Sequence, residues 1–376
     1  MLSLAHELKK TNPKCKIIYI GQKGEKVEGL QGRYQVFDEV RTVSAGKFRR
    51  YHGQGLVAHL TDVRTLYLNS RDFFKVLRGL HQAEKLIKAI KPDVVFSKGG
   101  YVAVPVGLAA RLMRVPIITH DSDTVPGLAN RIVGRWAAVH ATGMPEEYYS
   151  YPSGKVVYTG IPVDERIKLV TEGLQKSYKK NLGLPAEAPL LLAAGGGQGA
   201  QQINDLMLSA VPNLLAANPK LRVIHIVGIG LAGQMSEQQI KDAYLKELSG
   251  DDYARVTTLT FTGDFYEYSG AADLIITRAG ATAMSEFALQ AKACIVIPSS
   301  ALAGGHQLKN AQVLVQKNAA KVLPADASSE QLFKAANDLL KNAQVRQKIA
   351  KNLSSTAMPQ AAQMLAGIIL ETAEKD

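Results

Sequence analysis

The sequence predicts an α/β protein built from two doubly wound parallel-sheet domains. Short apolar strands alternate with amphipathic helices along most of the chain, which is the pattern of parallel βαβ units. A length of 376 residues favours two domains, at roughly 100–200 residues each. Several strands run directly into glycine-rich turns, and ligands of such proteins bind at the carboxyl ends of the strands.

Composition narrows the class of protein. A hydrophobic content of 46% with 21% charged residues is typical of a globular chain. We find no apolar run of about 18 residues that would predict a membrane span. Residues 1–10 lack the pattern of a signal peptide, and Cys15 and Cys294 form no CxxC motif. We therefore expect a reducing compartment and no zinc site.

The positive charge is concentrated in the first half. The formal net charge is +12, and residues 1–160 hold 24 basic and 13 acidic side chains, which leaves the second half close to neutral. Such a one-sided charge indicates a polyanionic partner: a nucleic acid, an anionic lipid surface or a phosphorylated substrate.

The first half starts with a predicted helix over residues 2–10, followed by a strand over 16–20. Because a doubly wound sheet normally begins with its central strand, either the fold is unusual or the chain begins after its first strand and the loop that follows, so that this sheet does not close. Further along the first half, strands are predicted at 91–96, 115–119 and 156–158, and a helix is predicted at 106–114.

Residues 62–91 are predicted to form a helix that carries apolar and basic side chains together. A helix of this kind can bind an anionic membrane surface. The alternative interpretation is that its apolar side chains form a stripe that faces the protein core. The confinement of the excess charge to this half favours the membrane interpretation, with contacts from Leu66, Phe73, Phe74 and Leu77.

The second half repeats the alternation after a connection near residues 161–170. We predict strands at 190–194, 222–227, 256–261, 273–277, 293–298 and 320–323. Helices are predicted at 200–217, 235–248, 282–290, 306–317, 328–341, 343–353 and 356–371.

Four of the five residues Gly195, Gly196, Gly197, Gln198 and Gly199 are glycines, between a strand and a helix. Such a turn lets backbone N–H groups approach an anion, so we expect it to hold a diphosphate; the alternative is an ordinary tight turn. A dinucleotide site would need an acidic residue near the end of the next strand, and a P-loop would need a lysine after the glycines. Neither is present.

Three other turns carry polar side chains suited to a nucleotide sugar. Glu286 follows the Gly280 turn and suits the hydroxyls of a ribose. Gln307 and Asn310 open a helix and suit sugar hydroxyls, and Thr262 ends a strand where the backbone can bind a base edge. Because these turns follow strands of one predicted sheet, we expect them to form a nucleotide-sugar cleft.

The first half has its own candidate site. A strand runs into the glycine loop Ser97–Pro105, and the next strand ends on a segment, residues 120–131, that contains His120, Asp121 and Asp123. Polar residues at the end of a parallel strand predict ligand contact, although a buried structural role is the alternative for His120.

These segments resemble the MurG family of peptidoglycan N-acetylglucosaminyltransferases, in glycosyltransferase family 28. The likeness covers nearly the whole chain and rests on six ordered motifs: Ser44–Tyr51, Gly99–Val102, His120–Arg131, Gly195–Ala200, Arg278–Ala281 with Glu286, and His306–Ala311. It implies a GT-B fold of two facing Rossmann-like domains. It also implies an inverting transfer of N-acetylglucosamine (GlcNAc) from UDP-GlcNAc to the C4 hydroxyl of the muramoyl sugar in lipid I, giving lipid II, without metal or other cofactor.

The resemblance implies a role for each matching position. Catalytic roles fall to His120 and Asp121. Donor contacts fall to Asp123, Gly195, Gly196, Gly197, Gln198, Gly199, Thr262, Arg278, Gly280, Ala281, Thr282, Ser285, Glu286, Gln307 and Asn310. Acceptor contacts fall to Lys98, Gly99, Gly100, Tyr101 and Asn130. The family works at the cytoplasmic face of the cell membrane as peripheral proteins, so the implied partners are UDP-GlcNAc, lipid I and an anionic membrane surface, and no nucleic acid.

The implied domains are an acceptor and membrane-binding domain at 1–162, a UDP-GlcNAc-binding domain at 163–355, and a C-terminal helix at 356–376 that packs back on the first domain. The family's first strand and its Gly-Gly-Thr-Gly-Gly-His loop have no match here, which suggests a start codon assigned too late. The segment Gly160–Asp164 lacks the family's arginine, for which Arg166 is a candidate replacement, and Gly197 replaces a serine.

Two other enzyme activities on this fold stay open at this point: a glycosyltransferase with a diacylglycerol acceptor, and a UDP-GlcNAc epimerase. The segment Val125–Asn130 favours the lipid I enzyme over both. A catalytically inactive nucleotide-sugar binding protein is the alternative outside enzymes, because the first glycine loop is absent.

Overall fold

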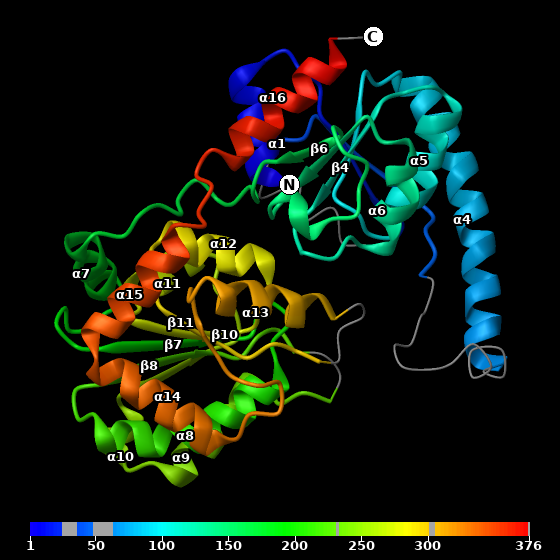
Figure 1. Cartoon of the computed structure of the whole chain (residues 1–376). Helices are drawn as coiled ribbons and strands as arrows, with labels where there is room; N and C mark the ends of the chain where they lie inside the picture. Colours follow the sequence, from blue (N-terminus) through cyan, green and yellow to red (C-terminus); the bar gives the residue numbers. More distant parts are fainter. Residues whose placement is uncertain (25–35, 48–62, 231–232, 301–304, 375–376) are drawn as a thin grey trace. The chain divides into compact units, whose positions relative to one another are not determined.

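The chain forms two compact units in a computed structural model that describes residues 1–24, 36–47, 63–230, 233–300 and 305–374 (Figure 1). The first unit comprises Met1–Asp164 and Met358–Asp376, and the second comprises Glu165–Ala357. Within the described residues, no helix is long and apolar enough to cross a membrane.

The second unit is a doubly wound sheet of six parallel strands in the order β12-β11-β10-β7-β8-β9. From β7 the chain builds outward to β8 and β9, then returns to place β10 on the other side of β7. The switch point between β7 and β10 is where a ligand crevice forms in such sheets. The strands are β7 (Leu190–Ala194), β8 (Arg222–Ile226), β9 (Val256–Leu259), β10 (Leu274–Thr277), β11 (Cys294–Val296) and β12 (Lys321–Val322).

Helices cover both faces of this sheet (Figure 1). Along β7, Leu191 and Ala193 join a core with α8, α9 and α14, whereas Leu190, Leu192 and Ala194 join one with α11, α12 and α13. Burial on both faces explains why the strand reads as a continuous apolar run. The helices are α7 (Glu172–Asn181), α8 (Gln201–Ala217), α9 (Glu237–Glu247), α10 (Gly250–Tyr253), α11 (Phe265–Ala271), α12 (Ala281–Leu289), α13 (His306–Gln316), α14 (Ser329–Lys341) and α15 (Ala343–Ser354).

In the first unit, the strands of the described residues form two separate parallel sheets: a pair, β1-β2, and a four-stranded sheet, β3-β4-β5-β6. The strands are β1 (Ile18–Gln22), β2 (Glu39–Val43), β3 (Val95–Ser97), β4 (Ile117–Asp121), β5 (Val139–Thr142) and β6 (Val156–Tyr158). The helical elements are α1 (Leu2–Thr11), α4 (Val63–Ile90), α5 (Ala103–Leu112), α6 (Leu128–Val133), η1 (Gly134–Trp136), η2 (Glu146–Tyr148) and α16 (Ala361–Ala373).

The C-terminal helix α16 packs beside α1 in the first unit (Figure 1). Leu4 and Leu8 of α1 share a core with Leu365, Ala366 and Ile369 of α16. The two ends of the chain are therefore joined through apolar contacts in one unit.

Candidate functional site

Three adjacent strands of the second unit, β11, β10 and β7, lead to helices that begin without a side-chain cap. The residues at the N-caps of α8, α12 and α13 are Ala200, Gly280 and Gly305. By contrast, α9 and α14, which follow the flanking strands β8 and β12, carry full capping boxes from Ser236 and Ser328, although α11, after β9, also lacks a side-chain cap. Backbone N–H groups of an uncapped first turn need another acceptor, and the helix dipole favours an anion there.

The loop after β7 adopts backbone angles that glycine permits. Gly196 and Gly199 have φ values of +101° and +80°. The Gly199 N–H donates to the Gly196 carbonyl at 2.9 Å. Gly196, Gly197 and Gln198 are exposed on the outer side of this turn, where a ligand can reach the backbone.

The loop after β10 is fixed by Arg278. Its Nη1 donates to the Gln202 side chain of α8 at 2.8 Å and to the carbonyl of Ile297, after β11, at 3.1 Å. Burial lowers the pKa of this guanidinium. Arg278 thus ties the end of β10 to the first turn of α8 and to the end of β11. Next to it, Ala281 is buried, Thr282 is exposed, and Ser285 and Glu286 are half-buried on α12.

Two predicted sugar contacts on α13 are themselves anchored. Gln307 accepts from the Ser299 N–H at 2.8 Å, and Asn310 donates to the Ala279 carbonyl at 2.9 Å. Both side chains are buried, at 8% and 2% exposure. Asn310 therefore supports the loop after β10, and sequence reasoning could not separate this support from direct ligand contact.

Thr262 follows β9, two strands away from β7, and accepts from the Asp264 N–H at 3.1 Å. Arg166 lies beside this turn: its Nη1 is 3.1 Å from the Asp264 carboxylate, and its guanidinium is 4.6 Å from the ring centre of Tyr266. These contacts place the candidate replacement arginine at the predicted base-binding turn.

In the first unit, Asn130 joins the glycine loop to the end of β4. The Ser97 hydroxyl donates to Asn130 Oδ1 at 3.1 Å and accepts from the Gly99 N–H at 3.2 Å. Asn130 Nδ2 donates to the His120 carbonyl and to Asp121 Oδ1, both at 3.0 Å. The structure therefore brings together the catalytic candidates and this part of the predicted acceptor loop.

Asp121 has a partner that sequence reasoning missed. The Tyr151 hydroxyl donates to Asp121 Oδ2 at 2.7 Å, and its ring stacks on His140 with ring centres 3.8 Å apart. Burial raises the pKa of Asp121, although the Tyr151 and Asn130 hydrogen bonds oppose the rise. Tyr151 lies 30 residues further along the chain, and its role had no local sequence signal.

His120 is fully buried. Its Nε2 donates to the Gly160 carbonyl at 2.9 Å, and Nδ1 has no partner among the described residues. Burial lowers the pKa of His120 to about 4, helped by the charge of Lys98. The ring is therefore neutral near pH 7 and a weak base. Asp123 is half-buried, and its carbonyl accepts from the Tyr149 hydroxyl at 3.0 Å.

Positive side chains adjoin the glycine loop of the first unit. Lys47 Nζ lies 5.9 Å from the ring centre of Tyr101, which is exposed. Lys98 is close enough to lower the pKa of His120 by its charge. Lys47 belongs to the motif Ser44–Tyr51, whose last four residues lie outside the described residues, and it joins Lys98, Gly99 and Gly100 as a candidate acceptor contact.

The predicted membrane face of α4 is exposed. Phe73, Phe74 and Leu77 are 50%, 68% and 46% exposed, and Tyr67 is 66% exposed. The side chain of Leu66 lies outside the described residues. Arg71, Lys75 and Arg78 are exposed on the same helix. The exposure of these rings argues against the core-facing alternative.

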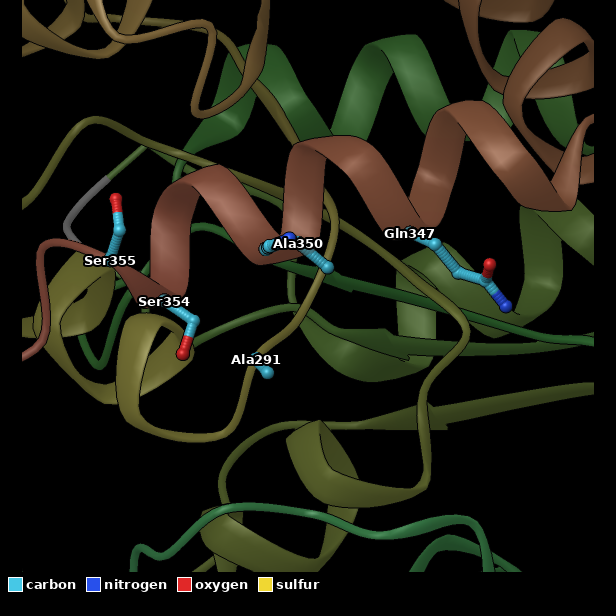
Figure 2. A pocket seen from close by; sticks show the side chains of 6 residues that line it. Ala291, Gln347, Ala350, Ser354 and Ser355 are labelled. Carbon is cyan, nitrogen blue, oxygen red and sulfur yellow. The ribbon is translucent and has the colours of Figure 1, made fainter.

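A shallow pocket of about 530 Å³ lies elsewhere in the second unit (Figure 2). It is lined by Ala291, Gln347, Ala350, Lys351, Ser354 and Ser355. Ala291 precedes β11, so the pocket lies at the amino ends of the strands, opposite the glycine loops. We therefore assign it no part in donor binding. Over the part of the chain that is described, no cluster of His, Cys, Asp or Glu could hold a metal ion.

Comparison with known proteins agrees with this architecture. Residues 1–142 match the glycosyltransferase family 28 N-terminal domain, and residues 190–365 match the glycosyltransferase family 28 C-terminal domain. A relative from Natranaerobius thermophilus, named UDP-N-acetylglucosamine–N-acetylmuramyl-(pentapeptide) pyrophosphoryl-undecaprenol N-acetylglucosamine transferase, is 30% identical over 98% of this chain and 94% of its own length. A relative of the same name from Geobacillus kaustophilus is 34% identical over 88% of this chain and 84% of its own length.

The crystal structure of Acinetobacter baumannii MurG superposes with a TM-score of 0.72 at 25% identity, covering 98% of this chain and 94% of that one. Its two parallel-sheet domains are of the GT-B type, which confirms the fold class predicted for this chain. The matched domains, the relatives and the fold together show that this chain belongs to glycosyltransferase family 28.

Proposed function

We propose that the protein transfers GlcNAc from UDP-GlcNAc to the C4 hydroxyl of the muramoyl sugar in lipid I, forming lipid II for peptidoglycan synthesis. Relatives that carry the name of this activity match over nearly the full chain. The structural observation that carries the proposal is the set of three uncapped helices: α8 and α12 at the switch point of the second unit's sheet, and α13 after the neighbouring strand β11.

In this proposal the second unit binds the donor. The loop Gly195–Gly199 and the segment Gly280–Thr282 bind the diphosphate through backbone N–H groups. Glu286 accepts the ribose hydroxyls, and Thr262 contacts uracil through its backbone. Gln307 contacts the GlcNAc hydroxyls. We assign Asn310 and Arg278 a positioning role, because their hydrogen bonds to Ala279, Gln202 and Ile297 join these loops to one another.

The first unit binds the acceptor, with Lys47, Lys98 and the backbone of the glycine loop near the lipid diphosphate. Transfer requires attack of the C4 oxygen on the anomeric carbon with inversion; the bond to the UDP oxygen breaks, and UDP leaves with the electron pair. The hydroxyl proton passes to a base. His120 and Asp121 are the two candidate bases: burial makes the carboxylate more basic and the imidazole less basic, which favours Asp121, whose oxygens also accept hydrogen bonds from Asn130 and Tyr151. UDP leaves toward the uncapped helices, whose N–H groups stabilise its charge.

Docking on the membrane is assigned to α4. Its exposed rings can enter the interface, and the exposed basic side chains beside them suit anionic lipid. The excess of positive charge in the first half acts in the same direction. The protein would then work as a peripheral protein at the cytoplasmic face of the cell membrane, where its lipid-linked acceptor lies.

Vesicles that contain lipid I, incubated with the protein and radiolabelled UDP-GlcNAc, test this function. Labelled lipid II is the expected product, and calorimetry of the same protein should show UDP binding. A protein that binds UDP but labels no lipid would overturn the transferase in favour of a nucleotide-sugar binding protein. Release of an epimerised free sugar would instead indicate an epimerase.

A further inference from the structure

Two glycine-rich turns of the second unit touch through their backbones. One is the donor loop Gly195–Gly199 after β7, and the other is the segment Val227–Ile229 after β8. An ideal Cβ built on Gly228 would lie 2.1 Å from Gly199 Cα and 2.2 Å from Gly199 N. Both glycines have positive φ, +94° and +80°. These two turns can approach so closely only because neither position carries a side chain.

A hydrogen bond between the two turns also orients a peptide group of the donor loop. The Ile229 N–H donates to the Gly197 carbonyl at 3.0 Å, at the exposed tip of the donor loop. A peptide carbonyl and the N–H of the same peptide unit point in opposite directions. Holding the Gly197 carbonyl toward Ile229 therefore turns the N–H of Gln198 away from Ile229, toward the outer side of the loop.

The segment that makes these contacts is firmly held. Val227 and Gly228 donate N–H groups to the carbonyls of Leu259 and Thr260 at 2.8 and 3.0 Å, which extends the β8–β9 pairing. From helix α8, Asn204 Nδ2 donates to the Val227 carbonyl at 3.3 Å, and Asn204 Oδ1 lies 3.1 Å from His225 Nε2. The segment is thus a fixed support rather than a mobile turn.

We propose that Gly228 and the Ile229 N–H are positioning residues for donor binding: they hold the glycine loop of β7 in the conformation that presents its N–H groups to the UDP diphosphate. This inference rests on the proposed function. It assigns a binding role to a segment that touches the loop and that the sequence motifs did not include. Neither residue contacts the donor in this proposal.

Replacing Gly228 by alanine tests the close approach. The new Cβ meets backbone atoms, which cannot rotate away, so the donor loop must move. Losing one backbone hydrogen bond to a charged phosphate weakens binding by roughly 10- to 100-fold. We expect Gly228→Ala to weaken UDP binding by roughly this factor in calorimetry. The KM for UDP-GlcNAc should rise by a similar factor, with a smaller change in kcat.

Gly230→Ala is the matched control. Gly230 also has a positive φ, +82°, but an added Cβ meets no atom of the described residues within 4 Å. Both variants carry the same kind of backbone strain, whereas only Gly228→Ala pushes on the donor loop. UDP affinity should therefore stay near wild type in Gly230→Ala. Equal affinities in the two variants would overturn the inference.

A second pair of variants keeps the test decisive if Gly228→Ala fails to fold. Ile229→Pro removes the N–H that the Gly197 carbonyl accepts, and Ile229→Ala keeps it. We expect weaker UDP binding only in the proline variant, and equal binding in both would contradict the role of this N–H. Wild-type protein that binds no UDP would refute the proposed function itself, whereas wild-type binding with unaffected variants would refute only this inference.

Discussion

Tyr151→Phe removes the hydroxyl that donates a hydrogen bond to the buried carboxylate of Asp121. Its effect on the stability of the protein should depend on pH. The hydroxyl donates to Asp121 Oδ2 at 2.7 Å, and Asp121 is only 5% exposed. A hydrogen bond to a charged group contributes about 1.5–3 kcal/mol. We therefore expect the free energy of unfolding at pH 7 to fall by about 1.5–3 kcal/mol, measured by urea denaturation.

The sign of the pH dependence follows from the direction of the pKa shift. Burial holds the pKa of Asp121 above its unfolded value, so its ionisation lowers stability as pH rises through the folded pKa. Because the Tyr151 hydrogen bond favours the ionised form, Tyr151→Phe should raise this pKa further. The loss of stability should therefore be larger at pH 7 than at acid pH, where the carboxyl is protonated in both proteins. In activity, the acidic limb of the pH profile should move to higher pH.

Tyr149→Phe is the matched control. Its hydroxyl donates to the carbonyls of Asp123 and Asp121 at 3.0 and 3.4 Å, so it stabilises no carboxylate directly. We expect a loss of about 1 kcal/mol with little pH dependence. If carbon-13 NMR showed the pKa of Asp121 unchanged or lowered in Tyr151→Phe, the assigned role of Tyr151 would be wrong.

Three other predictions concern separate parts of the chain. Glu286→Ala should weaken UDP binding by roughly 1.5–3 kcal/mol in calorimetry, whereas Glu330→Ala on the capped helix α14 should not; equal affinity would remove Glu286 from the site. Phe73→Ser with Phe74→Ser should reduce sedimentation with anionic liposomes at an unchanged thermal transition, and a lost transition would make these exposed rings structural. Burial lowers the pKa of Lys292 to about 8, from 10.5, so it should add stability as pH rises between these values. Lys292→Met should flatten that slope in urea titrations, and an unchanged slope would contradict the shift.

The catalytic candidates illustrate how burial redirects a prediction. The sequence placed His120 and Asp121 at the end of a strand, where ligands bind, and the structure places them there. Both are buried, however, and both hold hydrogen bonds to the protein. These bonds tie β4 to Gly160 and to Asn130. Burial has opposite effects on the basicity of the two side chains. It weakens the imidazole of His120 as a base and strengthens the carboxylate of Asp121.

The sequence by itself determined most of the strands, the glycine turns and the family, whereas it did not predict β2 or β5. The run Leu190–Ala194 is apolar throughout because both faces of β7 are covered, and a pattern of this kind is local. Positions such as Gly196 and Gly199 must adopt positive φ, which glycine alone does easily, so the turn is also visible in the sequence. The resemblance of these ordered motifs to a known family was sufficient to imply the GT-B fold.

Only the tertiary structure decided which of these residues touch. The contact of Gly228 with Gly199 and the bond from Tyr151 to Asp121 join residues about 30 positions apart. Likewise, Arg278 bonds to Gln202 across 76 positions, which makes it a support for the loops. Helical and strand periodicity extend over one element only, whereas these contacts depend on strand order and on how closely two backbones approach. For that reason the sequence indicated where the donor loop lies, and the fold revealed what holds it in place.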